Sequence, residues 1–336
     1  MSSSRSSGAR YLVAPDSFKG TFGAPEVVEA IGDGLEAGGA RSTDLCPVAD
    51  GGEGTMEALS AALGGRYVTR RVHDPLGRPL DARFALLGDG TTVVVEASEA
   101  SGFALIAPEE RDPERASTAG TGELVAAAIA TGARRILVAA GGSATTDGGA
   151  GAIEAIKRSG GLRGARIEVL CDVATPFERA AVVYGPQKGA DDDAVRRLTA
   201  RLKTQAAGFA RDPTGVPMTG AAGGLSGGLW AAFGAELRPG APYVFRLLEL
   251  PARLAACDAV VTGEGRLDSQ SFAGKVVGAL ADLCREAATE LHVIAGASSF
   301  DPSRAEELGV SSLQLAGTLD EIRQAGQRIA AGEPAR

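Results

Sequence analysis

Aromatic residues, histidine and long hydrophobic runs are all scarce in this chain of 336 residues. Aromatic residues make up 4% of the chain and hydrophobic residues 44%, so a buried core has to consist mainly of Ala, Val, Leu and Ile. No apolar run reaches the roughly 18 residues that a membrane-spanning helix needs, and we expect no membrane span. The only histidines are His73 and His292. A His-rich metal site and a histidine base are therefore disfavoured.

Paired cysteines and an excess of positive charge are also missing. Cys46, Cys171, Cys257 and Cys284 lie far apart and form no CxxC pair, which is typical of reduced thiols in a cytosolic protein. The formal net charge of −8 argues against a nucleic-acid partner, although lysines gathered locally could still bind a small anion. Residues 1–10 contain no apolar stretch typical of a signal peptide. We expect a disordered tail there, and a cytoplasmic location.

Glycine, in contrast, is abundant, with 47 residues clustered in separate loops. Between these loops, strand patterns alternate with helix patterns, which predicts an α/β fold with mostly parallel sheets. The length suggests about two domains. A Gly-Asp-Gly turn within 83–98 predicts a local antiparallel hairpin, and 241–258 predicts two short helices broken near Pro251. The other predicted strands are 10–17, 43–50, 134–142, 166–176, 259–268, 291–299 and 313–317, and the other predicted helices include 24–38, 54–65, 122–132, 191–212 and 274–290.

Glycine-rich or polar loops follow several of these strands. In parallel sheets, ligands bind at the carboxyl ends of the strands, so loops at one sheet edge can converge on one cleft. The loops concerned are "PDSFKGT" (15–21), "ADGGEGT" (49–55), "GGSATTDGGAG" (141–151), "CDVATP" (171–176) and "GEGRLDSQSFAGK" (263–275).

The loop at 141–151 leads from a strand into a helix and is suited to hold phosphate. Glycines let backbone N–H groups turn toward an anion, and the start of the next helix adds positive potential. The alternative is a tight turn where helix and strand pack closely. The loop matches neither a Walker A motif nor GxGxxG with a following acidic residue. The candidate cofactor-binding residues are Gly141, Gly142, Ser143, Thr145, Gly148 and Gly149.

Cationic and acidic side chains share these loops. Four cations beside glycine favour a polyanionic ligand, and carboxylates among them suit a Mg²⁺-nucleotide site. About half of these acids are expected to cap helices or hold loops together instead. The cations are Lys19, Lys188, Arg266 and Lys275, and the acids are Asp16, Asp50, Glu53, Asp147, Asp172, Glu264 and Asp268.

Eight motifs occur in the order found in the glycerate kinase family, the type I group of bacterial glycerate 2-kinases. They are "APDSFKGT", "PVADGGEGT", "VHDPLGRP", "STAGTGEL", "GGSATTDGGAG", "VYGPQKGA", "GAAGGLSGGL" and "VTGEGRLDSQSFAGK", and the resemblance covers about residues 11–300. It implies ATP-dependent, Mg²⁺-assisted phosphorylation of D-glycerate, usually at the 2-hydroxyl. It also implies two α/β domains with a cleft between them, the second inserted into the first. We place the first domain at 11–69 plus 286–336 and the inserted domain at 70–285.

The chain departs from the family pattern in four places. Thr146 and Thr175 stand where the family usually has Asn. The segment after Gly151 is much shorter than in the family, and so is the one between Phe177 and "VYGPQKGA". These changes bear on substrate identity.

The kinase hypothesis assigns a role to each candidate residue of this chain. The 141–151 loop would hold the ATP phosphates, and Lys188 and Lys275, with Lys19, would balance γ-phosphate charge. Asp147 and Asp268 are the candidates for Mg²⁺, and Arg266 for the glycerate carboxylate. Asp16 or Asp172 would orient or deprotonate the hydroxyl. The alternatives are a kinase for a related hydroxy acid or sugar acid, a catalytically decayed ligand-binding homologue, and a metal-dependent phosphatase. A homodimer is left open.

Overall fold

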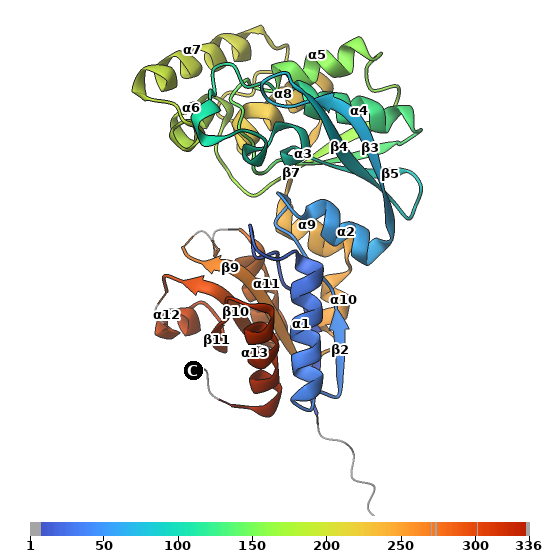
Figure 1. The fold of residues 1–336 in the computed structure, drawn as a ribbon, viewed down its shortest axis with the longest axis vertical. Helices are drawn as coiled ribbons and strands as arrows, with labels where there is room; N and C mark the ends of the chain where they lie inside the picture. Colours follow the sequence, from blue (N-terminus) through green and yellow to red (C-terminus); the bar gives the residue numbers. More distant parts are fainter. Residues whose placement is uncertain (1–7, 270, 273, 301, 334–336) are drawn as a thin grey trace, which may run out of the picture. The chain divides into compact units, whose positions relative to one another are not determined.

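The computed structural model describes residues 8–269, 271–272, 274–300 and 302–333, and within it the chain forms two compact units (Figure 1). Unit 1 contains the residues up to Asp50, Glu57–Ala62 and the residues from Ala241 onward. Unit 2 contains Gly51–Met56 and Leu63–Gly240. No helix among the residues described is long and apolar enough to cross a membrane.

Unit 1 is built on a five-stranded sheet in the order β11-β10-β9-β1-β2, and every neighbouring pair is parallel. All five strands therefore end at the same edge of the sheet. The strands are β1 (Arg10–Val13), β2 (Ser42–Leu45), β9 (Ala259–Leu267), β10 (Glu290–Ser298) and β11 (Ser312–Leu315). The helices are α1 (Ala24–Ala37), α2 (Thr55–Leu63), α9 (Gly240–Leu247), α10 (Leu250–Leu254), α11 (Val276–Ala287), α12 (Pro302–Glu307) and α13 (Leu319–Ala331).

Helices α1 and α13 lie side by side in unit 1 (Figure 1). Their apolar faces join the core that includes Val13 and Val261 of the sheet. The helices approach closely at Gly34, where an added Cβ would lie 2.0 Å from the carbonyl oxygen of Arg323. Glycine is required at this crossing because any side chain would push the two helices apart.

Unit 2 is built on a six-stranded sheet in the order β3-β4-β5-β6-β7-β8. The pairs β3–β4 and β4–β5 are antiparallel, and the pairs from β5 to β8 are parallel. The strands are β3 (Gly65–His73), β4 (Pro79–Leu87), β5 (Thr92–Glu96), β6 (Arg135–Ala139), β7 (Arg166–Cys171) and β8 (Glu236–Pro239). The α-helices are α3 (Ser98–Ser101), α4 (Ala119–Ala130), α5 (Ala150–Arg158), α6 (Ala180–Tyr184), α7 (Asp192–Gly208) and α8 (Leu225–Phe233). Short 3₁₀ turns include Phe103–Leu105, Pro108–Glu110, Pro186–Lys188 and Ala221–Gly224.

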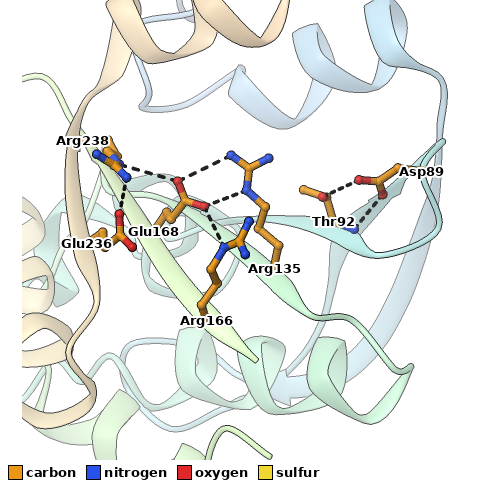
Figure 2. Close-up of polar contacts among 7 residues, drawn as sticks. All are labelled: Asp89, Thr92, Arg135, Arg166, Glu168, Glu236 and Arg238. Atoms are coloured by element: carbon orange, nitrogen blue, oxygen red, sulfur yellow. Dashed lines mark hydrogen bonds and ion pairs between the residues drawn. The ribbon is translucent and has the colours of Figure 1, made fainter. Parts of the chain in front are cut away.

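A network of charged side chains ties β6, β7 and β8 together near their amino ends (Figure 2). Glu168 of β7 is buried, and its carboxylate meets Arg135 of β6 at 2.7 Å, Arg166 at 3.4 Å and Arg238 of β8 at 3.6 Å. A buried carboxylate persists only when cations or donors surround it, which these arginines do. This network lies at the opposite edge of the sheet from the loops with candidate site residues.

The predicted fold class is confirmed: strands alternate with helices in both units, and most strand pairs are parallel. The hairpin expected within 83–98 is the β4–β5 pair, and the two helices near Pro251 are α9 and α10. The domain boundary at 285 does not match the sheet, because β9 pairs with β1 and β10 of unit 1. Of the predicted tail, residues 1–7 lie outside the described residues, and Arg10 already begins β1. The cleft expected between domains stays a prediction.

Candidate functional site

A cavity of about 430 Å³ opens at the carboxyl edge of the unit 1 sheet. Residues at or just after the ends of all five strands line it, so the parallel arrangement brings segments far apart in sequence to one place. The charged lining residues are Asp16, Lys19, Asp50, Glu264, Arg266, Asp268 and Lys275.

The segment after β1 holds Asp16 firmly in this cavity. Its backbone continues the pairing with β9, since the N–H of Asp16 donates to the carbonyl of Gly263 at 2.9 Å. The Asp16 side chain is buried and accepts a hydrogen bond from the N–H of Ser17 at 2.7 Å. Burial, and next the nearby Asp50 carboxylate, raise the pKa of Asp16 to about 8. Asp16 is thus a carboxyl group poised to exchange a proton near neutral pH.

Lys19 and Asp50 form an ion pair in the same cavity. Lys19 Nζ lies 2.9 Å from Asp50 Oδ2, and the Asp50 side chain is 1% exposed whereas that of Lys19 is 47% exposed. Lys19 sits in a tight loop that two backbone hydrogen bonds between Phe18 and Phe22 close. The carboxylate therefore anchors an ammonium group that still reaches solvent.

The segment from β9 into α11 contributes the other charged groups. Asp268 and Ser271 are tied to each other, because the N–H of Asp268 donates to Ser271 Oγ at 3.0 Å and the N–H of Ser271 donates to the Asp268 carbonyl at 3.0 Å. Lys275 is the residue immediately before α11. Burial raises the pKa of Glu264 to about 7, and its Oε1 is buried with no hydrogen-bond partner among the described residues.

These carboxylates fit a site that holds a divalent cation. Burial raises the pKa values of Asp16 and Glu264, and Glu264 Oε1 lacks a donor among the described residues, so a bound cation would favour their ionised forms. In the described part of the chain, no three His, Cys, Asp or Glu side chains form a ready-made metal cage. Mg²⁺ usually takes one or two carboxylates and completes its octahedron with water and phosphate oxygens, and the carboxylates of the cavity could supply such ligands.

The glycine-rich loop at 141–151 belongs to unit 2, and Asp147 occupies the place that we expected a phosphate to take. Asp147 Oδ2 accepts from Thr118 N–H at 2.9 Å, from Thr118 Oγ1 at 2.8 Å and from Gly151 N–H at 3.1 Å. Asp147 Oδ1 accepts from Gly149 N–H at 3.0 Å. With four donors on a buried carboxylate at the start of α5, Asp147 is a structural cap and not a free Mg²⁺ ligand.

Other amides of this loop are also used within the protein. Thr145 N–H donates to Ser143 Oγ at 3.1 Å, and Gly148 N–H donates to the Gly223 carbonyl at 3.1 Å. The carbonyl of Gly142 also has a partner within the protein, because it accepts a hydrogen bond from Phe103 N–H. In this geometry the loop is the tight, closely packed turn that we considered as the alternative to a phosphate cradle. The loop residues so placed are Gly141, Gly142, Ser143, Thr145, Gly148 and Gly149.

Lys188 is likewise in unit 2, and it is buried instead of lying in an open loop. Its ammonium donates to the carbonyl oxygen of Thr145, and burial lowers the pKa of Lys188 to about 7. The Lys188 ammonium therefore holds the backbone of the glycine-rich loop in place. Asp172 follows β7 in unit 2 and is half-buried, and it is not among the residues that line the unit 1 cavity.

The structure thus divides the predicted residues between two sheet edges. Five of them, Asp16, Lys19, Arg266, Asp268 and Lys275, line one cavity in unit 1. The loops do not all follow strands of one sheet, because 141–151 and 171–176 follow strands of the other sheet, and their convergence on one cleft stays a prediction. Sequence reasoning left Asp50 and Glu264 without a role. Asp50 lies in the loop that follows β2 and Glu264 lies in the last half of β9, and these positions were the signal that could have placed them.

Comparison with known proteins agrees with this arrangement of motifs. The model of the Glycerate kinase family matches residues 11–160 and 157–331, and the two matches overlap at 157–160. The chain is 36% identical to the Glycerate 2-kinase of Escherichia coli (strain K12), over 93% of this chain and 92% of that protein. It is 37% identical to the Glycerate kinase of Bacillus subtilis (strain 168), over 90% of this chain and 89% of that one.

A solved structure is similar over almost the whole chain. It is the crystal structure of a candidate glycerate kinase 2 from Salmonella typhimurium LT2, with a TM-score of 0.82 and 33% identity, covering 97% of this chain and 98% of that one. The chain belongs to the Glycerate kinase family.

Proposed function

We propose that this chain is a glycerate 2-kinase that transfers the γ-phosphoryl group of ATP to the 2-hydroxyl of D-glycerate with Mg²⁺, in the cytoplasm. The observation that carries the proposal is the unit 1 cavity, where three cations and four carboxylates meet at the carboxyl ends of parallel strands. Phosphoryl transfer needs mainly positioning and charge stabilisation, and these side chains supply both. Family membership favours glycerate as the acceptor.

The cations of the cavity suit the negative charge of the reactants. Lys19 and Lys275 would offset charge on the transferring phosphoryl group, as lysines do in other phosphoryl-transfer sites. Arg266 would bind the glycerate carboxylate, because its planar guanidinium can hold both carboxylate oxygens at once. The Asp50 ion pair keeps the Lys19 ammonium in the cavity before any ligand arrives.

Asp16 is the proposed proton acceptor. When the glycerate hydroxyl oxygen bonds to the γ-phosphorus, the bond to the ADP oxygen breaks and the hydroxyl proton has to leave. A carboxyl group with a pKa near the working pH is best suited to accept it. Asp16 meets this condition and lies in the cavity, whereas Asp172 lies in the other unit.

Asp268 and the neighbouring carboxylates would hold Mg²⁺. The metal would supply charge neutralisation on the phosphate oxygens when it is bound. The residues of this chain would fix its position, and the Ser271 hydroxyl holds the Asp268 backbone in place for that purpose.

The test is product analysis by ³¹P NMR after incubation with ATP, Mg²⁺ and D-glycerate. We expect a phosphomonoester whose phosphorus couples to the C2 proton. Lys275→Met should lower kcat by roughly 100-fold, the usual effect of removing one transition-state contact. Lys203→Met, which removes an exposed lysine of α7, is the matched control and should leave kcat unchanged.

Other outcomes separate the alternatives. ATP consumed only with a different hydroxy acid or sugar acid would keep the kinase and change its substrate. ATP left intact with every acid tried would refute the proposed function and favour a ligand-binding homologue. A homodimer stays a prediction, which the molar mass in solution would decide.

A further inference from the structure

A second cavity, of about 560 Å³, lies within unit 2, and none of the residues to which we assign phosphoryl transfer lines it. It is formed by the loop that leads from α3 to α4, by the segment before α7 and by α7 itself. Arg111 is in that loop and immediately follows the 3₁₀ turn Pro108–Glu110. The charged residues that line the cavity are Glu109, Glu110, Arg111, Asp112, Glu114, Arg115, Asp191 and Arg197.

Arg111 is ordered but its charge is not paired. The guanidinium carbon lies 5.3 Å from the centre of the Phe103 ring, in a cation–π contact. Its Nε atom is buried and finds no hydrogen-bond partner among the residues described. Folded proteins rarely leave a buried donor unsatisfied without a reason. Arg111 is half-buried and lines the cavity, and it has no ion pair among the residues described, so it is suited to an anion that the protein does not itself provide.

Most of the acidic residues around this cavity already have partners. Glu110 pairs with Arg78 at 3.0 Å, and Glu114 pairs with Arg197 at 2.8 Å. The Asp112 carboxylate accepts backbone N–H groups of its own turn, and the Asp191 carboxylate caps α7 by accepting from Ala194 N–H. The exposed Glu109 and Arg115 have no such contact described, so Arg111 is the cation that is both partly buried and unpaired.

The surroundings of Arg111 are built to hold it still. Its backbone packs against Gly189, which has a φ of 93° and has no room for a side chain without pressing on Arg111, since an added Cβ would lie 3.3 Å from the Arg111 Cβ. Phe103 in turn is fixed by its N–H bond to the carbonyl of Gly142 at 3.0 Å. The guanidinium is therefore pre-organised, which lowers the entropy cost of binding a ligand.

We propose that this cavity binds the carboxylate group of a small monocarboxylic acid through Arg111. A guanidinium suits a carboxylate because two parallel N–H bonds match its two oxygens. Five acidic residues against three arginines line the cavity, and this excess of negative charge disfavours a dianionic phosphate or a nucleotide. A single carboxylate adds only one negative charge beside an unpaired cation.

The test is a binding titration of the full chain without ATP or Mg²⁺, followed by ligand-observed NMR. An Arg266→Gln background removes the carboxylate contact that we assign to unit 1. The probes are D-glycerate, acetate and inorganic phosphate. We expect saturable binding of at least one of the two carboxylates and none of phosphate. Arg111→Gln should weaken that binding by about 10- to 100-fold, the range for hydrogen bonds to a charged group.

Two further variants help to interpret the result. Arg115→Gln removes the same charge from the same cavity at an exposed position and should leave the affinity unchanged. Phe103→Leu keeps an apolar side chain but removes the ring under the guanidinium, and should weaken binding about two- to fivefold. Circular dichroism and thermal unfolding establish that each variant is folded, and Phe103→Leu serves as the test if Arg111→Gln is not.

The outcomes also separate the possible sources of the carboxylate. Binding of D-glycerate alone would identify the acid substrate as the ligand, and binding of acetate as well would identify a general monocarboxylate site. Equal affinity in Arg111→Gln and its parent, binding of phosphate in preference to both acids, or no Arg111-dependent binding at all would overturn the inference. None of these results depends on turnover, so failure of the proposed kinase activity would show up separately in the ³¹P assay.

Discussion

Asp147 shows why a residue's role depends on its neighbours. In the sequence it is a carboxylate inside a glycine-rich loop, a setting typical of a Mg²⁺-phosphate site. In the structure, four donors from Thr118, Gly149 and Gly151 already surround it. Thr118 is 29 residues away in the sequence, and nothing local to the loop reveals that it supplies two of these donors.

We predict that Asp147→Ala lowers the free energy of unfolding by about 2–4 kcal/mol, because it leaves several buried donors without an acceptor. Urea denaturation measures the change. Asp193→Ala, which removes an exposed carboxylate of α7, should change stability by less than about 0.5 kcal/mol. If Asp147→Ala were as stable as the parent and instead lost a Mg²⁺-dependent gain in stability, the structural role would be wrong and the metal-ligand hypothesis would return.

Five of the site residues could be placed together from the sequence because they obey a simple rule. Asp16, Lys19, Arg266, Asp268 and Lys275 lie at or shortly after the ends of β1 and β9, and neighbouring parallel strands end side by side. Lys188 obeys no such rule. It sits in a glycine-containing turn like the others, but its burial beneath Thr145 depends on packing that the local sequence does not encode.

Among the elements, the long antiparallel pair β3–β4 was missed. Its residues 65–73 and 79–87 alternate weakly, because β3 is exposed over most of its length and only Val68 and Val72 are buried. Buried strands such as β6 and β9 were found because their apolar runs are continuous. The charged network of β6, β7 and β8 was also beyond reach, since it joins residues that only the strand order brings together.

Helix α2 is tied at its start to the end of β5 by a buried carboxylate. Glu96 Oε1 accepts the N–H of Met56 at 2.7 Å, and Ser98 Oγ donates to Glu96 Oε2 at 3.3 Å. Burial raises the pKa of Glu96 from 4.5 to about 7, and the nearby Glu99 and Glu53 carboxylates add to the rise. The folded chain therefore binds this proton more tightly than the unfolded chain does.

We predict that this contact makes stability fall as pH rises. The contribution of protonated Glu96 is complete below pH 4.5 and is lost as the pH passes through 7. Glu96→Gln keeps an acceptor for Met56, and its amide N–H can donate to Ser98 Oγ instead of accepting from it, but the side chain cannot ionise. Its free energy of unfolding should gain on that of the parent between pH 4.5 and 7, by on the order of 2–3 kcal/mol, in urea titrations across that range. A constant difference between the two proteins would contradict the raised pKa.

At the scale of the whole molecule, the sequence predicted an α/β chain of two domains but not which of the two sheets each loop follows. Strands alternating with helices do not reveal which strands pair, and β9 could equally have followed β8 into the second sheet. The pairing of β9 with β1 is fixed by contacts between residues about 248 positions apart, such as Ala259 with Tyr11. The predicted boundary at 285 was wrong because it assigned β9 to the inserted domain. Helix and strand patterns continue unchanged across residue 240, so they do not mark where unit 2 ends.

The four cysteines report on both units at once, because Cys46, Cys257 and Cys284 belong to unit 1 and Cys171 to unit 2. Burial raises the pKa of Cys46 to about 11 and that of Cys284 to about 12, and it raises the pKa of Cys171 further still. Cys257 is half-buried, and burial raises its pKa as well. The reactive form of a thiol is the thiolate, so three of these groups should be inert in the folded chain.

We therefore predict that Ellman's reagent at pH 8 labels at most one thiol quickly in the native protein and all four after unfolding in guanidinium chloride. Cys257→Ser should remove the fast phase and leave three slow thiols, whereas Cys46→Ser should leave the fast phase intact. Because the slow thiols lie in the cores of both units, their rates measure how often each core opens. Two or more thiols reacting at once in the native protein would mean that at least one of these cores is not closed as the structure shows.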